Sequence, residues 1–208
     1  MSVNFRLYVV CLSTINYTGG TTLRNKSKLK TLSLLIIFSF ILGGCITGKY
    51  KPTPKMADLE ILFADSIWTG NKIPKGQQCN KFGGNAETPK LVVKNIPART
   101  NALIMEFSDR SYQPMNSGGH GKIGYNITPG IQQVTIPSVP GHTFDLPKGF
   151  FLVSAHKGSN WDKAGAYMPP CSGGKGYLYV VKVKAVYNAP KGKESQLLGE
   201  AELTLGTY

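Results

Sequence analysis

The stretch Tyr177-Leu-Tyr-Val-Val-Lys-Val-Lys-Ala-Val-Tyr187 is the most regular part of the 208-residue chain. Every second residue of it is aromatic or aliphatic, while the positions between them include Lys182 and Lys184. A period of two is typical of a β-strand, because successive side chains point to opposite faces of a sheet. The stretch therefore predicts a long strand with one buried face.

Shorter apolar runs lie on both sides of this stretch and predict further strands. They cover residues 59–63, 90–96, 102–107, 150–155 and 197–205. Helix signals are weak, and residues 161–166 suggest only a turn. With 24 Gly and 13 Pro separating the runs, the pattern predicts a mostly β protein, an antiparallel β-sandwich with few short helices.

Composition excludes several protein classes. At 41% hydrophobic and 17% charged residues, the chain is too apolar for a disordered protein. Four cysteines are too few for a disulfide-dense scaffold, and no apolar run has the ~18–20 residues of a membrane-spanning helix. We therefore expect one domain with its own core, plus a targeting segment.

The targeting segment is predicted at residues 1–45. Lys28 and Lys30 precede the apolar run 31–42, which leads to Leu-Gly-Gly-Cys45. This pattern resembles the bacterial lipoprotein signal. The resemblance implies cleavage before Cys45 and a diacylglycerol on its thiol; a short buried helix or an uncleaved anchor is the alternative. Residues 1–27 fit less well and suggest an over-extended start or a long n-region.

The segment 46–56 is predicted to be a tether, since Pro/Lys-rich chain is extended and packs poorly. It would connect the lipid to a domain spanning 57–208. Loss of the signal would remove five of the 24 basic residues and lower the net charge from +13 to +8. The remaining charges are dispersed, so we expect no nucleic-acid partner.

Two cysteines remain in the predicted domain, Cys79 and Cys171. An exported domain with two cysteines favours a disulfide between them, and two buried thiols are the alternative. The three histidines lack metal-ligand spacing and no CxxC motif occurs, so we expect neither a metal nor a cofactor.

Four segments of the domain, taken in order, resemble the phosphatidylethanolamine-binding protein (PEBP) family, in its bacterial Raf-kinase-inhibitor-like branch. The first is GQQCNKFGGNAETPKLVVKNIP at 76–97, similar to a Cys-containing glycine loop followed by Ser-Pro-x-Leu-x-Trp. The others are 100–109, which ends in aspartate, GAYMPPCSGGKGYLYVVKVKAV at 165–186, and AELTLGTY at 201–208. The resemblance implies a PEBP-type β-sandwich over 57–208.

The resemblance also implies a small anion pocket. Asp109 matches the first aspartate of the family's Asp-Pro-Asp motif, and His120 matches the histidine of its His-Trp pair. Tyr177 stands where the family has the histidine of His-x-Tyr, beside the glycine loop of Gly173 and Gly174. Loop N–H groups and imidazoles would donate to the oxygens of a ligand.

Several positions depart from the family pattern. Arg110 and Ser111 replace Pro and the second Asp, Gly121 replaces the tryptophan of His-Trp, and Val93 replaces that of Ser-Pro-x-Leu-x-Trp. The pocket is therefore expected to be partly degraded.

The expected function is that of an exported, lipid-anchored binding protein without catalysis, whose pocket takes a small anionic or polar ligand. The alternative is a protein-interaction or inhibitor module of the cell envelope. No paired carboxylates or Gly-x-Ser-x-Gly motif favour an enzyme. Ile46, which follows Cys45, favours the outer membrane, facing the periplasm, if the host is Gram-negative.

Overall fold

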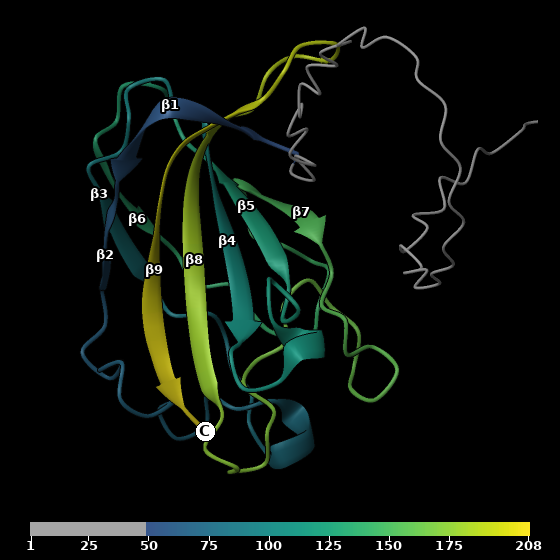
Figure 1. Ribbon diagram of the computed structural model, residues 1–208. Helices are drawn as coiled ribbons and strands as arrows, with labels where there is room; N and C mark the ends of the chain where they lie inside the picture. Colours follow the sequence, from purple (N-terminus) through teal and green to yellow (C-terminus); the bar gives the residue numbers. More distant parts are fainter. Residues whose placement is uncertain (1–48) are drawn as a thin grey trace, which may run out of the picture. The chain divides into compact units, whose positions relative to one another are not determined.

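The computed structural model of the chain describes residues 49–208 (Figure 1). The predicted signal 1–45, its lipidation residue Cys45 and the first residues of the tether lie outside the described residues. The described residues contain two sheets, a hydrophobic core and one disulfide. Between residues 49 and 208 no helix has the length and hydropathy needed to cross a membrane.

The larger sheet has six strands. In spatial order they are β1 (Lys51–Asp58), β9 (Gln196–Thr207), β8 (Leu178–Tyr187), β4 (Ala102–Asp109), β5 (Lys122–Asn126) and β7 (Phe150–Ser154). β1 runs parallel to β9, and all other neighbours are antiparallel. The stretch that opened the sequence analysis is therefore β8, near the centre of this sheet.

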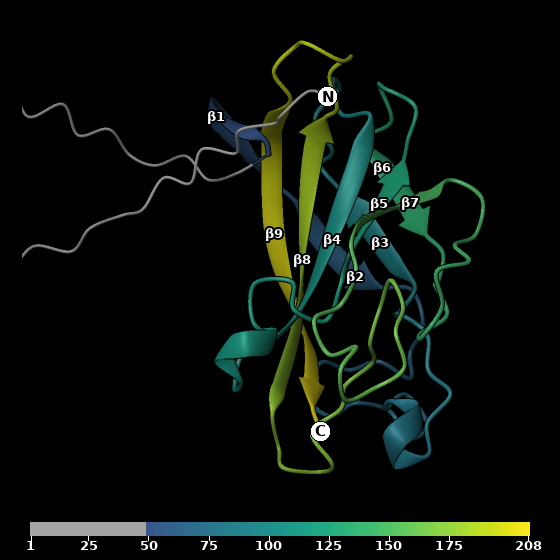
Figure 2. The same cartoon turned by 90° about the vertical axis from the view of Figure 1, so that its right-hand side faces the viewer.

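A smaller antiparallel sheet lies behind the larger one (Figures 1 and 2). Its strands are β2 (Glu60–Phe63), β3 (Leu91–Lys94) and β6 (Gln133–Ile136), with β3 in the middle. The regular helices of the described residues are two 3-10 turns, η1 (Asn80–Phe82) and η2 (Gln113–Met115). The prediction of a mostly β sandwich with few short helices is confirmed, with one parallel pair added.

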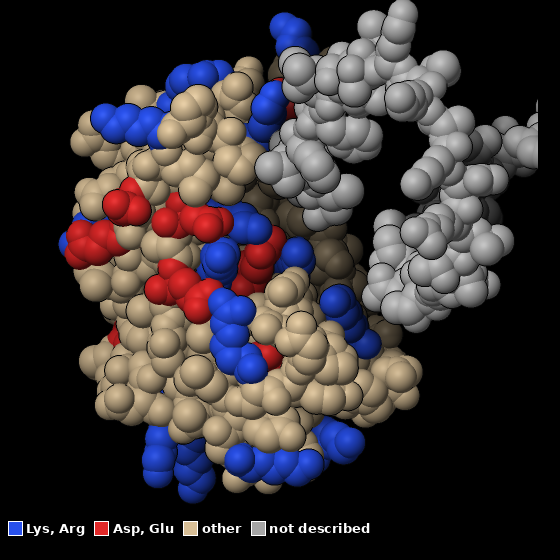
Figure 3. All heavy atoms as spheres, viewed as in Figure 1, with Lys and Arg blue, Asp and Glu red and all other residues tan. Residues whose placement is uncertain are grey.

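The period of two in β8 separates a face that packs in the main core from an outer face, on which Lys182 and Lys184 lie between the buried Val180 and Val186. Val181 and Val183 are fully buried against the smaller sheet, and burial of each such side chain stabilises the fold by about 1.5–3 kcal/mol. On the outer face Lys184 Nζ lies 2.9 Å from a carboxylate oxygen of Glu106, and Lys182 Nζ lies 3.6 Å from one of Glu200. Figure 3 shows Lys and Arg side chains interleaved with Asp and Glu side chains on this side of the molecule.

The structure corrects the prediction of a free tether over residues 46–56. Residues 51–56 belong to β1, which pairs with β9 at Lys51 and Pro52 and again at Ala57 and Asp58, with a register shift between. An edge strand hydrogen bonds on one side only, so it tolerates prolines that lack an N–H donor. β5 and β6 lie outside the ranges in which strands were predicted.

The two ends of the sandwich carry different features. At one end Ala102 pairs with Val186, and the described chain enters at Lys51, which pairs with Gln196. At the other end Asp109 pairs with Tyr179, and the loops with η1, η2 and the chain terminus gather there (Figure 1). We call these the entry end and the loop end.

Candidate functional site

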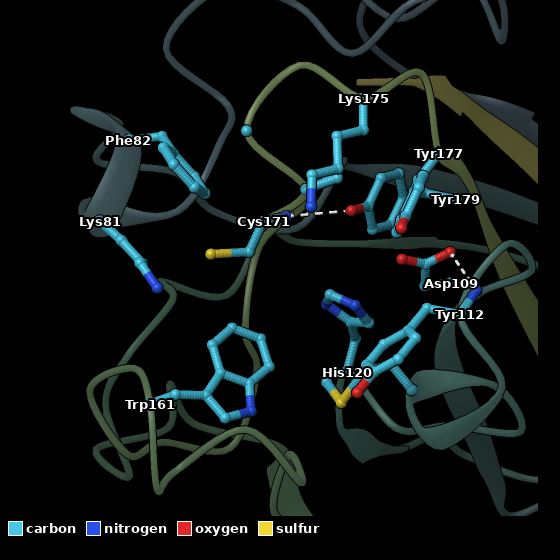
Figure 4. Close-up of a pocket in the computed structure, with 13 residues that line it drawn as sticks. Lys81, Phe82, Asp109, Tyr112, His120, Trp161, Cys171, Lys175, Tyr177 and Tyr179 are labelled. Carbon is cyan, nitrogen blue, oxygen red and sulfur yellow. Dashed lines mark hydrogen bonds between the residues drawn. The ribbon is translucent and has the colours of Figure 1, made fainter.

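A cavity of about 540 Å³ opens at the loop end. Asp109, His120, Gly173 and Tyr177 all line it, although they come from separate segments of the chain. Gly174, the fifth residue that the sequence analysis singled out for ligand binding, is not among the lining residues. The structure thus brings four of the five residues together (Figure 4).

Asp109 is the last residue of β4 and is 3% exposed. Its Oδ1 accepts hydrogen bonds from the backbone N–H groups of Ser111 at 2.7 Å and Tyr112 at 3.1 Å. Burial raises the pKa of the Asp109 carboxyl, and these two bonds and one from the Tyr179 side chain oppose the rise. The chain turns sharply after β4, and this turn fixes the carboxylate at the cavity wall.

His120 also lines the cavity and is 3% exposed. Its Nδ1 is 2.8 Å from the carbonyl oxygen of Met168, which can only accept, so Nδ1 carries the hydrogen. Burial lowers the pKa of His120 to about 4, and the ring is therefore neutral at pH 7. Its Nε2 keeps a lone pair, so this imidazole accepts a hydrogen bond, where the sequence analysis expected it to donate.

Gly121 follows His120 where the family pattern has tryptophan. Its φ is +117°, and a Cβ built on it would lie 2.0 Å from the carbonyl oxygen of Ala166. The loop 118–121 thus packs backbone against backbone, and this contact requires glycine. The departure from the pattern is a packing feature of the wall that carries His120.

Two tyrosines on one face of the 177–187 stretch reach the cavity. Tyr177 precedes β8, and its backbone N–H donates to the carbonyl of Tyr208 at 2.9 Å. Tyr179 lies deeper, where its hydroxyl accepts a bond from the N–H of Cys171 at 3.1 Å. Burial is the main cause that raises the pKa of Tyr179 to about 12. Tyr179 was missed as a site residue, although its spacing of two from Tyr177 places it on the same face.

The disulfide between Cys79 and Cys171 is confirmed, with the two Cα atoms 5.2 Å apart. It joins η1 to the loop 171–176, and the N–H of Cys79 also donates to the carbonyl of Pro170 at 3.0 Å. Gly173 has a φ of +69°, and a Cβ there would lie 2.8 Å from the Phe82 ring. Glycine therefore lets this loop pack closely on η1.

The disulfide also determines whether these cysteines can bind a metal ion or act as nucleophiles. Cys79, Cys171 and Asp162 are the only group within 49–208 whose atoms are close enough to hold a metal ion. Both sulfurs are bonded to each other, so neither is available as a thiolate ligand or as a nucleophile.

The rim of the cavity is basic and aromatic, which the sequence analysis did not foresee. Lys81 and Lys175 direct their amino groups toward the cavity in Figure 4. Lys81 Nζ lies 5.9 Å from the ring centre of Phe82 and 5.7 Å from that of Trp161. With Tyr112, these rings form aromatic walls of the cavity. Their loops are far apart in sequence, so no local spacing revealed them.

The other two histidines are structural in this fold. His142 and His156 are each 3% exposed and do not line the cavity. His142 Nδ1 and His156 Nε2 lie 3.1 and 3.0 Å from the carbonyl oxygen of Lys163. They therefore brace the segment 157–166, which presents Trp161 to the cavity.

Comparison with known proteins gives structural similarity only. No protein-family model matches the chain, and no curated protein matches it. Among solved structures, a PEBP homologue, CT736 of Chlamydia trachomatis, is similar with 19% identity over 73% of this chain and 97% of its own, at a TM-score of 0.45. E. coli YbcL, described as a member of the mammalian PEBP family, is similar with 19% identity over 73% of this chain and 98% of its own, at a TM-score of 0.46.

Proposed function

We propose that the domain is a PEBP-type binding module without catalysis, and that its cavity takes a small polar ligand bearing a negative group. The observation that carries the proposal is the convergence of Asp109, His120, Gly173 and Tyr177 on one cavity. The cavity volume of about 540 Å³ lies within the range of small-molecule sites. Such sites typically combine a small number of convergent polar groups with apolar and aromatic walls, as this cavity does.

The charges of the cavity indicate how such a ligand would lie. The inner wall offers acceptors, the Asp109 carboxylate and the Nε2 lone pair of His120. The rim offers two ammonium groups, Lys81 and Lys175. A ligand that presents a hydrogen-bond donor inward and an anion to the rim satisfies both. A monoprotonated phosphate or O-phosphoethanolamine has this chemistry.

A role without catalysis is supported by what the polar groups already do. The Asp109 Oδ1 is bonded to backbone amides, and the Nδ1 of His120 to a carbonyl. Cys171 lines the cavity, but its sulfur is bonded to Cys79 and is not available as a nucleophile. The Tyr179 hydroxyl interacts with the Asp109 carboxyl in the cavity wall, but burial is the main cause that raises the pKa of Tyr179 to about 12, so this hydroxyl stays protonated and is a weak nucleophile.

We further propose export and anchoring through a lipid on Cys45, with the domain in the cell envelope and, in a Gram-negative host, on the periplasmic face of the outer membrane. The support is the sequence pattern of 28–45. Metabolic labelling with a fatty acid tests it, because the wild-type chain should carry the label and Cys45→Ser should not. An unlabelled wild-type chain contradicts the anchor.

A thermal-shift titration with inorganic phosphate and O-phosphoethanolamine tests the ligand proposal. At a hundredfold excess over Kd, binding adds about 2.7 kcal/mol, which raises Tm by roughly 5–10 °C in a domain of this size. His120→Ala should lose most of the shift, and Lys157→Ala, an exposed residue outside the cavity lining, should keep it. If neither probe shifts the Tm of wild type, the ligand class is wrong.

A protein partner in the cell envelope is the second candidate. The observation that favours it is the exposure of the rim aromatics, since Phe82 and Trp161 are 39% and Tyr112 is 46% exposed. Exposed aromatic side chains are enriched in protein interfaces. Affinity capture from membranes distinguishes the candidates: a stoichiometric partner lost in Trp161→Ala but kept in His120→Ala favours this one.

A further inference from the structure

We propose that the entry end of the sandwich is a docking surface for an anionic lipid bilayer, so that the cavity opens away from the membrane. The proposal deepens the proposed anchoring and rests on it for the cellular setting. It concerns contacts of the folded domain with lipid head groups, in addition to any covalent lipid.

The segments of the entry end carry mostly basic residues. The entry end is built from the segments 49–57, 97–101, 127–131 and 188–195. Their basic residues are Lys49, Lys51, Lys55, Arg99, Lys191 and Lys193, and their single acidic residue is Glu194. Glu194 is paired with Lys51 at 3.4 Å. Figure 3 shows Lys and Arg side chains along the upper rim, above the mixed charges of the sheet face.

These segments lie next to one another and form one surface. The N–H of Lys51 donates to the carbonyl of Ser195 at 3.0 Å, and the Arg99 guanidinium lies 5.2 Å from the ring centre of Tyr187. The N–H of Gly130 donates to the carbonyl of Ala98 at 2.8 Å. The basic side chains therefore emerge from neighbouring loops and can meet a flat anionic surface together.

An apolar groove lies at the same end of the domain. A hollow of about 400 Å³ lies between β1 and the loop 97–99, with Met56 and Leu198 in its lining and Lys55 and Arg99 beside them. Met56 is 39% exposed. Apolar side chains beside cations are the arrangement that suits the boundary between head groups and acyl chains.

The short segment between Cys45 and Lys49 limits the distance between a lipid on Cys45 and the entry end. Three residues separate Cys45 from Lys49, and the four Cα–Cα steps between them span at most about 14 Å. A lipid on Cys45 would therefore keep the entry end close to the bilayer, where the field of anionic head groups attracts lysines within about one Debye length, 8–10 Å.

The cavity lies at the opposite end. β4 runs from Ala102 at the entry end to Asp109 in the cavity wall, seven steps that span about 23 Å. With the entry end on the membrane, the cavity would open to the aqueous phase. Its ligand would then be a soluble molecule rather than a head group of the bilayer that holds the anchor.

Vesicle sedimentation with residues 46–208 tests the proposal. This fragment contains both sheets, the core and the disulfide, and it lacks Cys45, so the result does not depend on lipidation. The vesicles are phosphatidylcholine alone, or with about 30% phosphatidylglycerol, at low and high salt. We expect binding only to anionic vesicles and only at low salt.

Charge-matched variants locate the surface. Lys55→Gln/Lys191→Gln/Lys193→Gln should weaken binding about a hundredfold, at about fivefold per lysine. Lys72→Gln/Lys75→Gln/Lys157→Gln removes the same charge from exposed lysines away from the entry end and should have little effect. Equal loss in both variants, equal binding to uncharged vesicles, or no binding at low salt overturns the proposal. Fatty-acid labelling of Cys45 reports separately on the anchor.

Discussion

The Nδ1 atom of His120 lies 2.8 Å from the carbonyl oxygen of Met168, and this bond joins the loop after β4 to the segment that leads into Cys171. Because the carbonyl can only accept, the bond fixes the tautomer of the ring and leaves Nε2 as an acceptor, and the ring is part of the cavity lining. The ring is buried, and its pKa of about 4 keeps it neutral above that pH. The acceptor character of His120 depends on this one contact.

The first prediction concerns pH and stability. The folded-state pKa of His120, about 4, lies below the ordinary value of 6.5, so the unfolded chain binds more protons between these pH values. His120 therefore costs stability as pH falls from about 6.5 to 4, by about 3 kcal/mol in all. His156, whose pKa burial also lowers, acts in the same direction. Asp109, whose pKa is raised, acts oppositely just above pH 3.8.

Urea unfolding at several pH values measures this effect. His120→Gln should show a shallower loss of stability below pH 6.5 than wild type. An NMR titration of the wild-type imidazole gives a second measure that needs no variant, with an expected pKa of about 4 for His120. An observed pKa near 6.5 would show that the ring is not held neutral in the way described.

The second prediction concerns the disulfide. It links residues 92 positions apart, and the chain-entropy model assigns it about 4–5 kcal/mol of stability. We expect Cys79→Ser/Cys171→Ser to unfold at lower urea and to bind ligand more weakly, because η1 and the loop 171–176 are no longer joined. Reductant should reproduce the loss in wild type and leave the double variant unchanged. An unchanged midpoint in reductant would contradict the role of the bond.

The third prediction concerns Gly121. Gly121→Ala places a Cβ 2.0 Å from the Ala166 carbonyl oxygen at a φ of +117°, so we expect a loss of about 3 kcal/mol or more. Gly130→Ala is the matched control, since its φ is +93° but a Cβ there meets nothing within 4 Å. It should cost only the backbone strain, about 1 kcal/mol. Equal losses in thermal unfolding would mean that backbone packing at Gly121 is unimportant.

Strands with a regular period were predictable, and short or edge strands were not. The alternation at 177–187 predicted β8 to within one residue of its observed start at Leu178. β1 was missed because Pro52 and Pro54 indicate a free extended chain, and only the partner β9 makes it a strand. In β5, Gly124 interrupts the pattern because the Phe151 ring occupies the space of a side chain.

The candidate site was predictable only where family motifs covered it. Asp109, His120 and Tyr177 were placed by motif, and the structure places them together. Lys81 and Trp161 lie 80 residues apart in sequence, and only the fold brings them to one rim. The donor and acceptor state of His120 depends on Met168, which no local spacing indicates.

Calorimetric titration with O-phosphoethanolamine measures most directly whether the cavity binds an anion at its lysine rim. Wild type should bind, and Lys81→Gln/Lys175→Gln should bind at least tenfold more weakly, because charge-assisted bonds contribute about 1.5–3 kcal/mol each. Lys72→Gln/Lys75→Gln, which removes the same charge outside the cavity lining, should bind like wild type. Equal affinity in all three proteins, or no heat of binding in wild type, would contradict anion binding at the rim formed by Lys81 and Lys175.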